Sequence, residues 1–128
     1  MKKYFAVGIG GALGTVIRHC IQMIPLNTVY RPLLTMLINI SGSFLLGFLI
    51  ILFVRLVPVT AEIRLGVTTG CLGGYTTFST FCKESVLLYL SGHILFSAAY
   101  AVFSILLGIA AAWLGIFLAK CLERRRVS

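Results

Sequence analysis

Four long apolar stretches occupy most of this sequence, near residues 4–24, 33–54, 65–90 and 94–119. Each is close to the ~20 residues that a helix needs to cross the hydrocarbon core of a bilayer. Because 59% of the residues are hydrophobic and only 11% are charged, the composition lies outside the range of soluble globular domains. The sequence therefore predicts an all-α integral membrane protein with four transmembrane helices, forming a single domain over residues 1–128.

The third stretch is interrupted by a polar segment, GGYTTFSTF at residues 73–81. Glycine adopts non-helical backbone angles at little steric cost, so Gly73-Gly74 predicts a break in the third helix. Backbone that leaves helical geometry inside a membrane must be buried in protein or line water. Carbonyl groups freed in this way bind cations in broken transmembrane helices. The alternative is that the glycine pair only allows close packing between helices.

Aromatic and hydroxyl side chains follow this break. If the helix resumes near Thr76, Phe78 and Phe81 lie three residues apart on one face. A neighbouring stripe carries three polar side chains, Thr77, Thr80 and Glu84. Hydroxyls and the Asn39 amide are hydrogen-bond donors, and phenyl rings have a positive edge, so such a site suits a small, hard anion. Equally compatible is a plain core, with both rings buried and the hydroxyls bonded to the carbonyls four residues before them.

Two charged residues lie within the apolar stretches. Arg18 comes about fourteen residues into the first stretch, and an arginine at the bilayer centre costs roughly 2.5–3.5 kcal/mol or more. Its long side chain can extend to the far interface, because Pro25 follows only seven residues later. At a pore mouth it would raise the local concentration of anions. Glu84 is an odd neighbour for an anion path, and we expect it to pair with a nearby cation or to lie near an entrance.

The net charge of +8 is unevenly distributed along the chain. Eight of the eleven Lys and Arg residues fall on the side of the membrane that carries the termini, and at most three fall on the other side. By the positive-inside rule, both termini are expected in the cytoplasm. The basic tail directly follows the last stretch, so headgroup contact and orientation explain it better than nucleic-acid binding does.

No motif points to catalysis or to a metal site built from side chains. The four cysteines are scattered without a C-x-x-C pair, and we interpret them as small buried hydrophobes. His19 and His93 have no companion ligands at metal spacing. The sequence shows neither a nucleophile–base pair nor a phosphate-binding G-x-x-x-x-G-K-[ST] motif. The chain is therefore not expected to be an enzyme.

Three motifs resemble the signatures of the small bacterial fluoride channels called Fluc or CrcB: GGALGTVIR at 10–18, NISGSFLLG at 39–47 and GCLGGYTTFSTF at 70–81. The resemblance covers nearly the whole chain, and the third motif is specific. It implies an antiparallel (inverted) dimer of four-helix subunits, with two narrow pores at the interface of the two chains. It also implies a passive, fluoride-selective channel that exports fluoride from the cytoplasm across the bacterial inner membrane.

The resemblance further implies roles for particular residues. The positions that match the fluoride pathway are Phe78, Phe81, Asn39, Thr35, Ser79, Thr80, Tyr100, Ser104, Glu84 and Arg18. Gly73 and Thr76 match positions whose backbone carbonyls, two from each subunit, hold a central structural sodium ion. Two departures are visible. Gly108 stands where some members have a further hydroxyl, and His19 follows the arginine where an aromatic residue is common.

The uneven loop charge bears on the identity of the second subunit. A sequence that inserts in both orientations usually has nearly balanced charge, and eight against at most three is not balanced. The partner is therefore either a second copy or an oppositely oriented paralogue, and the imbalance favours the paralogue. The competing function is a small proton-coupled exporter of toxic cations, resembling the small multidrug resistance family. Such exporters need a carboxylate in the first helix, where this chain has Arg18 and no acid.

Overall fold

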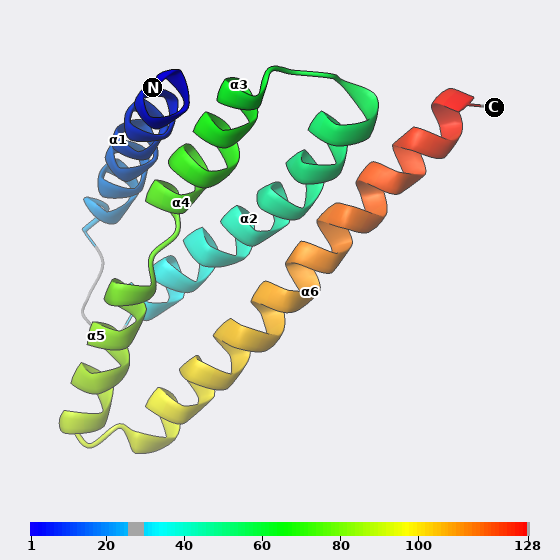
Figure 1. Cartoon of the computed structure of the whole chain (residues 1–128). Helices are drawn as coiled ribbons and strands as arrows, with labels where there is room; N and C mark the ends of the chain where they lie inside the picture. Colours follow the sequence, from blue (N-terminus) through cyan, green and yellow to red (C-terminus); the bar gives the residue numbers. More distant parts are fainter. Residues whose placement is uncertain (26–29, 128) are drawn as a thin grey trace.

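The computed structural model describes residues 1–25 and 30–127, and every regular element in these residues is helical (Figure 1). In chain order the elements are α1 (Lys2–Gln22), α2 (Arg31–Ile51), the π-helix η1 (Leu52–Leu56), α3 (Ala61–Leu65), the π-helix η2 (Gly66–Cys71), α4 (Leu72–Tyr75), α5 (Phe78–Leu90) and α6 (Ile94–Val127). The prediction of an all-α fold is confirmed for this part of the chain.

Three segments among the described residues are helical, long and apolar enough to cross a membrane: Lys2–Gln22, Arg31–Leu56 and Ile94–Arg125. They correspond to the first, second and fourth apolar stretches of the sequence. The third stretch is divided instead. The elements α3, η2 and α4 follow one another without interruption as far as Tyr75, and α5 begins at Phe78. The chain is therefore a multi-pass membrane protein with an interrupted segment between two of its long helices.

The interruption lies just beyond the position that the sequence predicts. Gly73 and Gly74 are both helical within α4, and the extended residues are Thr76 (ψ 155°) and Thr77 (φ −145°, ψ 120°). The prediction of a break at the glycine pair is therefore wrong in its position. Gly74 serves packing instead, because a Cβ there would overlap the carbonyl of Gly11 on α1. Gly73 is exposed, and nothing lies within 4 Å of the place its Cβ would take.

Direct backbone contact joins α1 to the first part of the interrupted segment. A side chain at Gly10 would overlap the carbonyl of Gly66, and one at Gly14 would overlap the carbonyl of Cys71. A Cβ at Gly70 would come within 2.6 Å of the carbonyl oxygen of a residue on α1. Small residues let membrane helices approach closely and so gain van der Waals contact. The glycines of GGALG thus fasten α1 to η2 and α4.

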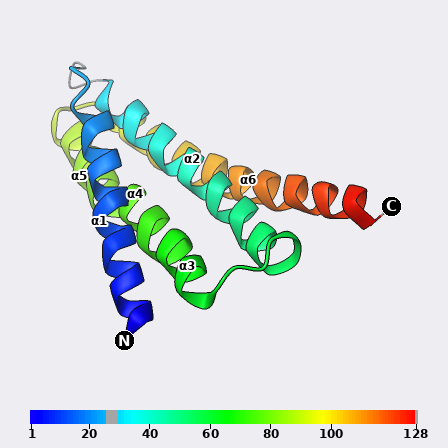
Figure 2. The same ribbon diagram turned by 90° about the horizontal axis from the view of Figure 1, so that it is seen from above.

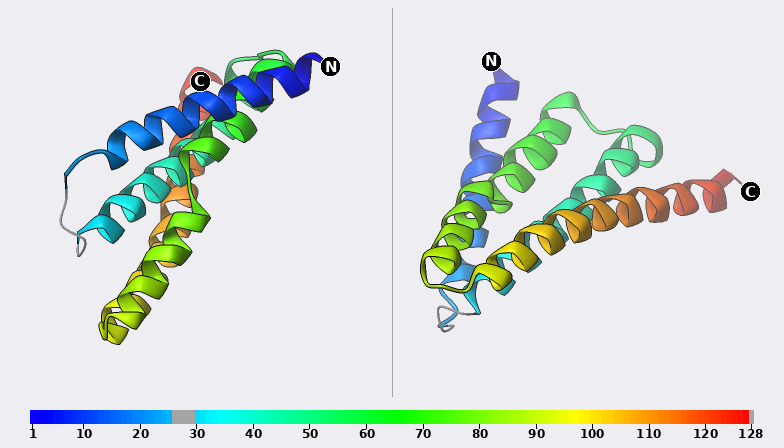
Figure 3. Two further views of the ribbon diagram at one scale, coloured as in Figure 1. Left: turned by 90° about the vertical axis from the view of Figure 1, so that its left-hand side faces the viewer. Right: turned by 90° about the horizontal axis from the view of Figure 1, so that it is seen from below.

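A second close pair is formed by α2 and α6, which run side by side (Figure 1). Gly47 on α2 lies against the backbone of Ala112, and Gly115 on α6 lies against the carbonyl of Phe44. Seen from above and from below, this pair diverges from the pair formed by α1 and the α3–α4 segment (Figures 2 and 3). The α5 helix packs on α6 and closes the narrow end of the divergence.

Large apolar side chains cover the outside of the helices. Leu95 is 81% exposed, Trp113 is 65% exposed and Phe103 is 56% exposed. Monomeric soluble proteins rarely expose contiguous apolar surface of this kind, whereas lipid or another membrane helix covers it readily. The buried interior of the described residues is small, and its largest fully buried side chains are Ile38 and Thr35 on α2.

Candidate functional site

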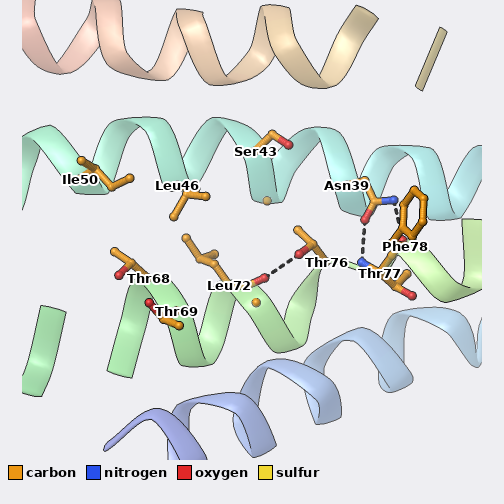
Figure 4. A pocket seen from close by; sticks show the side chains of 12 residues that line it. Asn39, Ser43, Leu46, Ile50, Thr68, Thr69, Leu72, Thr76, Thr77 and Phe78 are labelled. Carbon is orange, nitrogen blue, oxygen red and sulfur yellow. Dashed lines mark hydrogen bonds between the residues drawn. The ribbon is translucent and has the colours of Figure 1, made fainter. Parts of the chain in front are cut away.

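The break between α4 and α5 is held by one side chain from α2. The Thr77 N–H donates to Asn39 Oδ1 at 2.8 Å, and Asn39 Nδ2 donates to the Thr77 carbonyl at 2.9 Å (Figure 4). An extended residue inside a membrane protein leaves both of these backbone groups without a helical partner. The Asn39 amide satisfies both groups at once, because it carries a donor and an acceptor side by side. Asn39 therefore stabilises the extended conformation itself.

Thr77 also begins the second helix of the interrupted segment. Its Oγ1 accepts from the Thr80 N–H at 3.2 Å, which caps the N-terminus of α5, and donates to Thr80 Oγ1 at 2.9 Å. Ser79 Oγ lies 3.4 Å from the same oxygen. These hydroxyls bond to one another and not to the carbonyls four residues before them. Thr77 is only 5% exposed. It is not among the residues that the sequence analysis assigns to the fluoride pathway. The signal that could have identified it is its place three residues before Thr80, because a threonine is a common N-cap.

The interruption deprives several carbonyl groups of their helical partners. In a continuous helix the Thr77 amide would bond to the Gly73 carbonyl, but it bonds to Asn39. The Thr80 amide would bond to the Thr76 carbonyl, but it bonds to Thr77 Oγ1. The Gly74 carbonyl receives the Thr15 hydroxyl from α1 at 3.5 Å. The family resemblance implies a cation at the carbonyls of Gly73 and Thr76. In the structure both carbonyls have lost their helical donors.

Main-chain oxygens of this kind fit a hard alkali cation. Unwound carbonyls coordinate Na⁺ in broken transmembrane helices. The Thr76 side chain does not compete for the position, because its hydroxyl donates to the Leu72 carbonyl at 2.9 Å. Gly73 faces open space, so another chain can approach it closely. Main-chain carbonyls without helical donors are therefore chemically suited to the sodium ion that the family resemblance implies.

Three aromatic rings form a row that leads away from the break. The ring centroids of Phe78 and Phe81 are 5.7 Å apart at 32°, and those of Phe81 and Tyr100 are 5.2 Å apart at 47°. Phe78 is 77% exposed, so it is not part of a core within this chain. Both centroid distances lie within the range of attractive aromatic pairs, so the two contacts hold the three rings together. The row joins the start of α5 to α6.

Glu84 lies at the far end of this row, between two hydroxyls. Thr35 Oγ1 donates to Glu84 Oε1 at 3.0 Å, and the Tyr100 hydroxyl donates to Glu84 Oε2 at 2.9 Å. Thr35 is 1% exposed and Tyr100 is 7% exposed. Of the two expectations for Glu84, a cation partner or a place near an entrance, the cation partner is not found among the described residues, where the two hydroxyls bond to the carboxylate. Three helices, α2, α5 and α6, thus meet at one carboxylate.

The remaining predicted residues are less closely linked to this network. The Ser104 hydroxyl on α6 is buried and has no hydrogen-bond partner within the described part of the chain. Gly108 follows on the same helix, and a Cβ there would stand 3.8 Å from Ser43 Oγ. Arg18 is half-buried near the end of α1. No hydrogen bond or ion pair joins it to the row of rings or to Glu84 among these residues. The structure therefore groups eight of the ten predicted pathway residues around α5.

A groove of about 560 Å³ opens beside the break, between α2 and the η2–α4 segment. Its lining residues are Asn39, Gly42, Ser43, Leu46, Ile50, Thr68, Thr69, Leu72, Gly73, Thr76, Thr77 and Phe78. Figure 4 shows α2 along one side of the groove and η2–α4 along the other, with Asn39 and Thr77 meeting at one end. The exposed ring of Phe78 and the open face of Gly73 both belong to this groove.

These features define a class: a multi-pass helical membrane protein whose broken segment places main-chain oxygens, hydroxyls and aromatic edges at the junction of several helices. Residues 5–116 match the family described as CrcB-like protein, Camphor Resistance (CrcB). The chain belongs to this family, which confirms the resemblance seen in its motifs.

Individual relatives are similar over nearly their whole length. The chain is 43% identical over 126 residues to "Fluoride-specific ion channel FluC" of Ruminiclostridium cellulolyticum, covering 97% of this chain and 94% of the relative. It is 44% identical over 126 residues to "Fluoride-specific ion channel FluC 2" of Halalkalibacterium halodurans, covering 98% and 92%. A protein of Carboxydothermus hydrogenoformans with the same name is 44% identical over 117 residues, covering 91% and 87%. The family is one of ion channels, so the chain is not an enzyme.

Proposed function

We propose that this chain is the subunit of a passive, fluoride-selective channel that exports fluoride from the cytoplasm. The observation that carries the proposal is the row of hydroxyls and aromatic rings that begins at the break and ends at Glu84. Relatives of about the same length are named as fluoride-specific ion channels, which supports the choice of anion. Fluoride is small and strongly hydrated, so hydroxyl hydrogens and aromatic edges suit it without a fixed cation that would trap it.

The pathway residues have separate roles in this proposal. Phe78 and Phe81 present ring edges to the ion, and Ser79, Thr80 and Ser104 supply hydroxyls along the way, with Tyr100 at the far end, where its hydroxyl donates to Glu84. Asn39 and Thr35 contribute from α2. Asn39 stabilises the break through one hydrogen of its Nδ2 group, and the second hydrogen of that group remains to serve the path. Glu84 orients the hydroxyls of Thr35 and Tyr100 at the end of the track. Arg18 lies at the vestibule, where its charge concentrates anions without blocking them.

The channel is proposed to be an antiparallel dimer with two pores, each built from both subunits. The interrupted segment α3–α5 is the third of four spans in each subunit. Two observations support a second chain at this face. The Phe78 ring is 77% exposed, and the groove beside it is open although polar groups line it. A single chain therefore supplies one wall of the path and needs a partner for the other.

We further propose that the carbonyls of Gly73 and Thr76 from the two subunits hold a structural sodium ion at the centre of the dimer. A bound cation would compensate the negative ends of the carbonyl dipoles at these two positions. The loss of helical donors at both positions supports this role. After the break, the Thr77 hydroxyl donates to Thr80 Oγ1, which leaves the hydrogen of the Thr80 hydroxyl available to the anion path.

The direction of transport follows from electrostatics. With the protein in the bacterial inner membrane and its termini in the cytoplasm, the inside-negative potential drives an anion outward by about 2.3 kcal/mol per 100 mV. Fluoride that enters as neutral HF and ionises in the cytoplasm would leave without ATP or a coupled proton. The rival function, proton-coupled export of toxic cations, is disfavoured, because α1 carries Arg18 and no acid.

The decisive test is ion efflux from liposomes that contain the purified protein, alone or together with an oppositely oriented paralogue. We expect rapid fluoride efflux and little chloride efflux when potassium and valinomycin balance the charge. Efflux should continue when a protonophore removes any proton gradient. Equal chloride flux, or flux that requires a proton gradient, would contradict the assignment.

The same preparation tests the identity of the partner. The imbalance of eight cationic side chains against at most three favours an oppositely oriented paralogue over a second copy. If the paralogue is required, liposomes with this chain alone will not conduct, and adding the paralogue will restore efflux. A conducting antiparallel homodimer of this chain alone would rule the paralogue out as a requirement.

A further inference from the structure

Three consecutive residues at the break each meet a different part of one short segment of α2. The Tyr75 hydroxyl lies 2.9 Å from Ser41 Oγ, and the Thr76 methyl group packs where a side chain at Gly42 would stand. Thr77 is bonded through both its N–H and its carbonyl to Asn39. Each of residues 75–77 therefore has its own contact with the segment Asn39–Gly42 of α2.

The direction of the Ser41–Tyr75 hydrogen bond follows from the other bond that Ser41 makes. The Ser41 hydroxyl donates its single hydrogen to the Ile38 carbonyl at 3.0 Å. Its oxygen is then left as an acceptor, so the Tyr75 O–H is the donor. Removing the Tyr75 hydroxyl breaks only this link, because the bond from Ser41 to Ile38 remains.

The position of Tyr75 gives this link its consequence. Tyr75 is the last residue of α4, and Gly73 lies two residues before it in the same helix. Asn39 holds the chain after Thr76, and Ser41 holds it before Thr76. With the peptide of Thr76 held from both sides, its carbonyl has little freedom to rotate. Without the Ser41–Tyr75 bond, the side-chain hydrogen bonds from α2 to residues 75–77 would come from Asn39 alone.

We propose that Ser41 and Tyr75 are a positioning pair that sets the direction of the Gly73 and Thr76 carbonyls, and so tunes the affinity of the break for sodium. This inference rests on the proposed sodium site. The pair is expected to act on the cation site and not on the anion path. Among the described residues, its hydrogen bonds involve neither the Phe78–Phe81 rings nor the carboxylate of Glu84. The pair lies before the break and the anion track lies after it.

The test uses the purified full-length protein and its Tyr75→Phe and Ser41→Ala variants, singly and combined. The primary readout is the sodium concentration that gives half of the maximal rise in melting temperature, with choline keeping the ionic strength constant. We expect this concentration to rise roughly two- to tenfold in each single variant, the range for one lost hydrogen bond. The shift in sodium concentration should not add up in the double variant, because both changes remove the Ser41–Tyr75 bond, although Ser41→Ala also removes the bond to the Ile38 carbonyl. Fluoride efflux at saturating sodium should stay within about twofold of the unmodified protein.

Tyr89→Phe is the matched control, because Tyr89 lies on α5 and is 58% exposed. It should leave the half-stabilising sodium concentration unchanged. An equal fall in melting temperature at every sodium concentration would show a merely structural bond and overturn the inference. The inference would also be overturned if the Tyr75→Phe or Ser41→Ala variant lost fluoride efflux even at saturating sodium. Unmodified protein that conducts fluoride but shows no sodium dependence would refute the sodium site together with this pair. Unmodified protein that conducts no fluoride, either alone or together with the oppositely oriented paralogue, would refute the channel assignment instead.

Discussion

The two halves of the interrupted segment differ in how they are held. The first half, from α3 to α4, meets α1 through glycine backbones, and its closest contacts involve carbonyl groups of the main chain. The second half, α5, meets α2 and α6 through hydroxyls, an amide, a carboxylate and aromatic rings. The first half is therefore sensitive mainly to side-chain volume, with the Ser41–Tyr75 bond as a polar contact at its end, and the second half is sensitive mainly to hydrogen-bonding chemistry. The separation lets a single segment anchor the fold and build a polar path.

The largest expected effect is on the anchoring half. Gly14→Leu would force a side chain into the carbonyl of Cys71, and backbone has no alternative rotamer to relieve the overlap. We expect the cost to fall in the tail of about 4–5 kcal/mol or more, so that no folded protein is recovered. Size-exclusion chromatography and the melting temperature in detergent would measure this.

Gly8→Leu is the matched control on the same helix. Nothing lies within 4 Å of the position of its Cβ, so this variant should behave like the unmodified protein. If the two substitutions have equal effects, backbone contact is not what fastens α1 to α4.

The next effect concerns the link between the two halves. Asn39→Leu removes the partners of the Thr77 N–H and carbonyl. Each group left unpaired costs about 1–3 kcal/mol, so we expect a loss of roughly 2–4 kcal/mol after partial relaxation. Asn39→Asp keeps the acceptor for the Thr77 N–H and loses the donor to the Thr77 carbonyl. Its stability should therefore lie between that of the unmodified protein and that of Asn39→Leu. Melting temperature and fluoride efflux, measured on the same samples, would test the ranking. An Asn39→Leu variant of full stability would show that the break does not depend on this amide.

A smaller stability effect but a clear functional one is expected in the ring row. Phe78→Ile should leave the melting temperature of the isolated subunit nearly unchanged, since the ring is 77% exposed. Efflux of fluoride should fall on the order of tenfold for Phe78→Ile and for Phe81→Ile, which corresponds to about 1.4 kcal/mol in the barrier. Phe5→Ile, at a 71% exposed position on α1, is the control. If both variants of the row conduct normally, the proposed pathway is wrong.

The smallest effect is expected at the end of the polar row. Thr35→Val keeps the shape of the side chain and removes the donor to Glu84 Oε1. We expect a loss of about 1 kcal/mol, because the carboxylate retains the hydroxyl of Tyr100. Thr35→Ser should recover most of this loss. Thermal unfolding would compare the three proteins, and a Thr35→Ser variant as unstable as Thr35→Val would indicate that packing of the methyl group matters more than the hydroxyl.

Several features of the site were predictable because they depend on local spacing. The GGYTTFSTF segment indicated a break, and the i,i+3 spacing of Phe78 and Phe81 indicated a shared face. The rings do lie together, 5.7 Å apart. The exact residues of the break were not predictable from glycine content, since Gly74 is used for contact with α1. The partners of Glu84 were also missed, because Thr35 and Tyr100 lie far from it in the sequence.

By itself, the sequence determined that the chain is helical, that it enters the membrane several times and that one segment cannot remain a regular helix. Those properties follow from the length of apolar runs and from residue types that act on their immediate neighbours. Only the tertiary structure decided where the helix stops, because Asn39 offers the Thr77 backbone a better partner than the next turn would. It also decided which carbonyls lose their donors and which hydroxyls meet the carboxylate. Such choices depend on contacts between distant helices, and no local pattern encodes them.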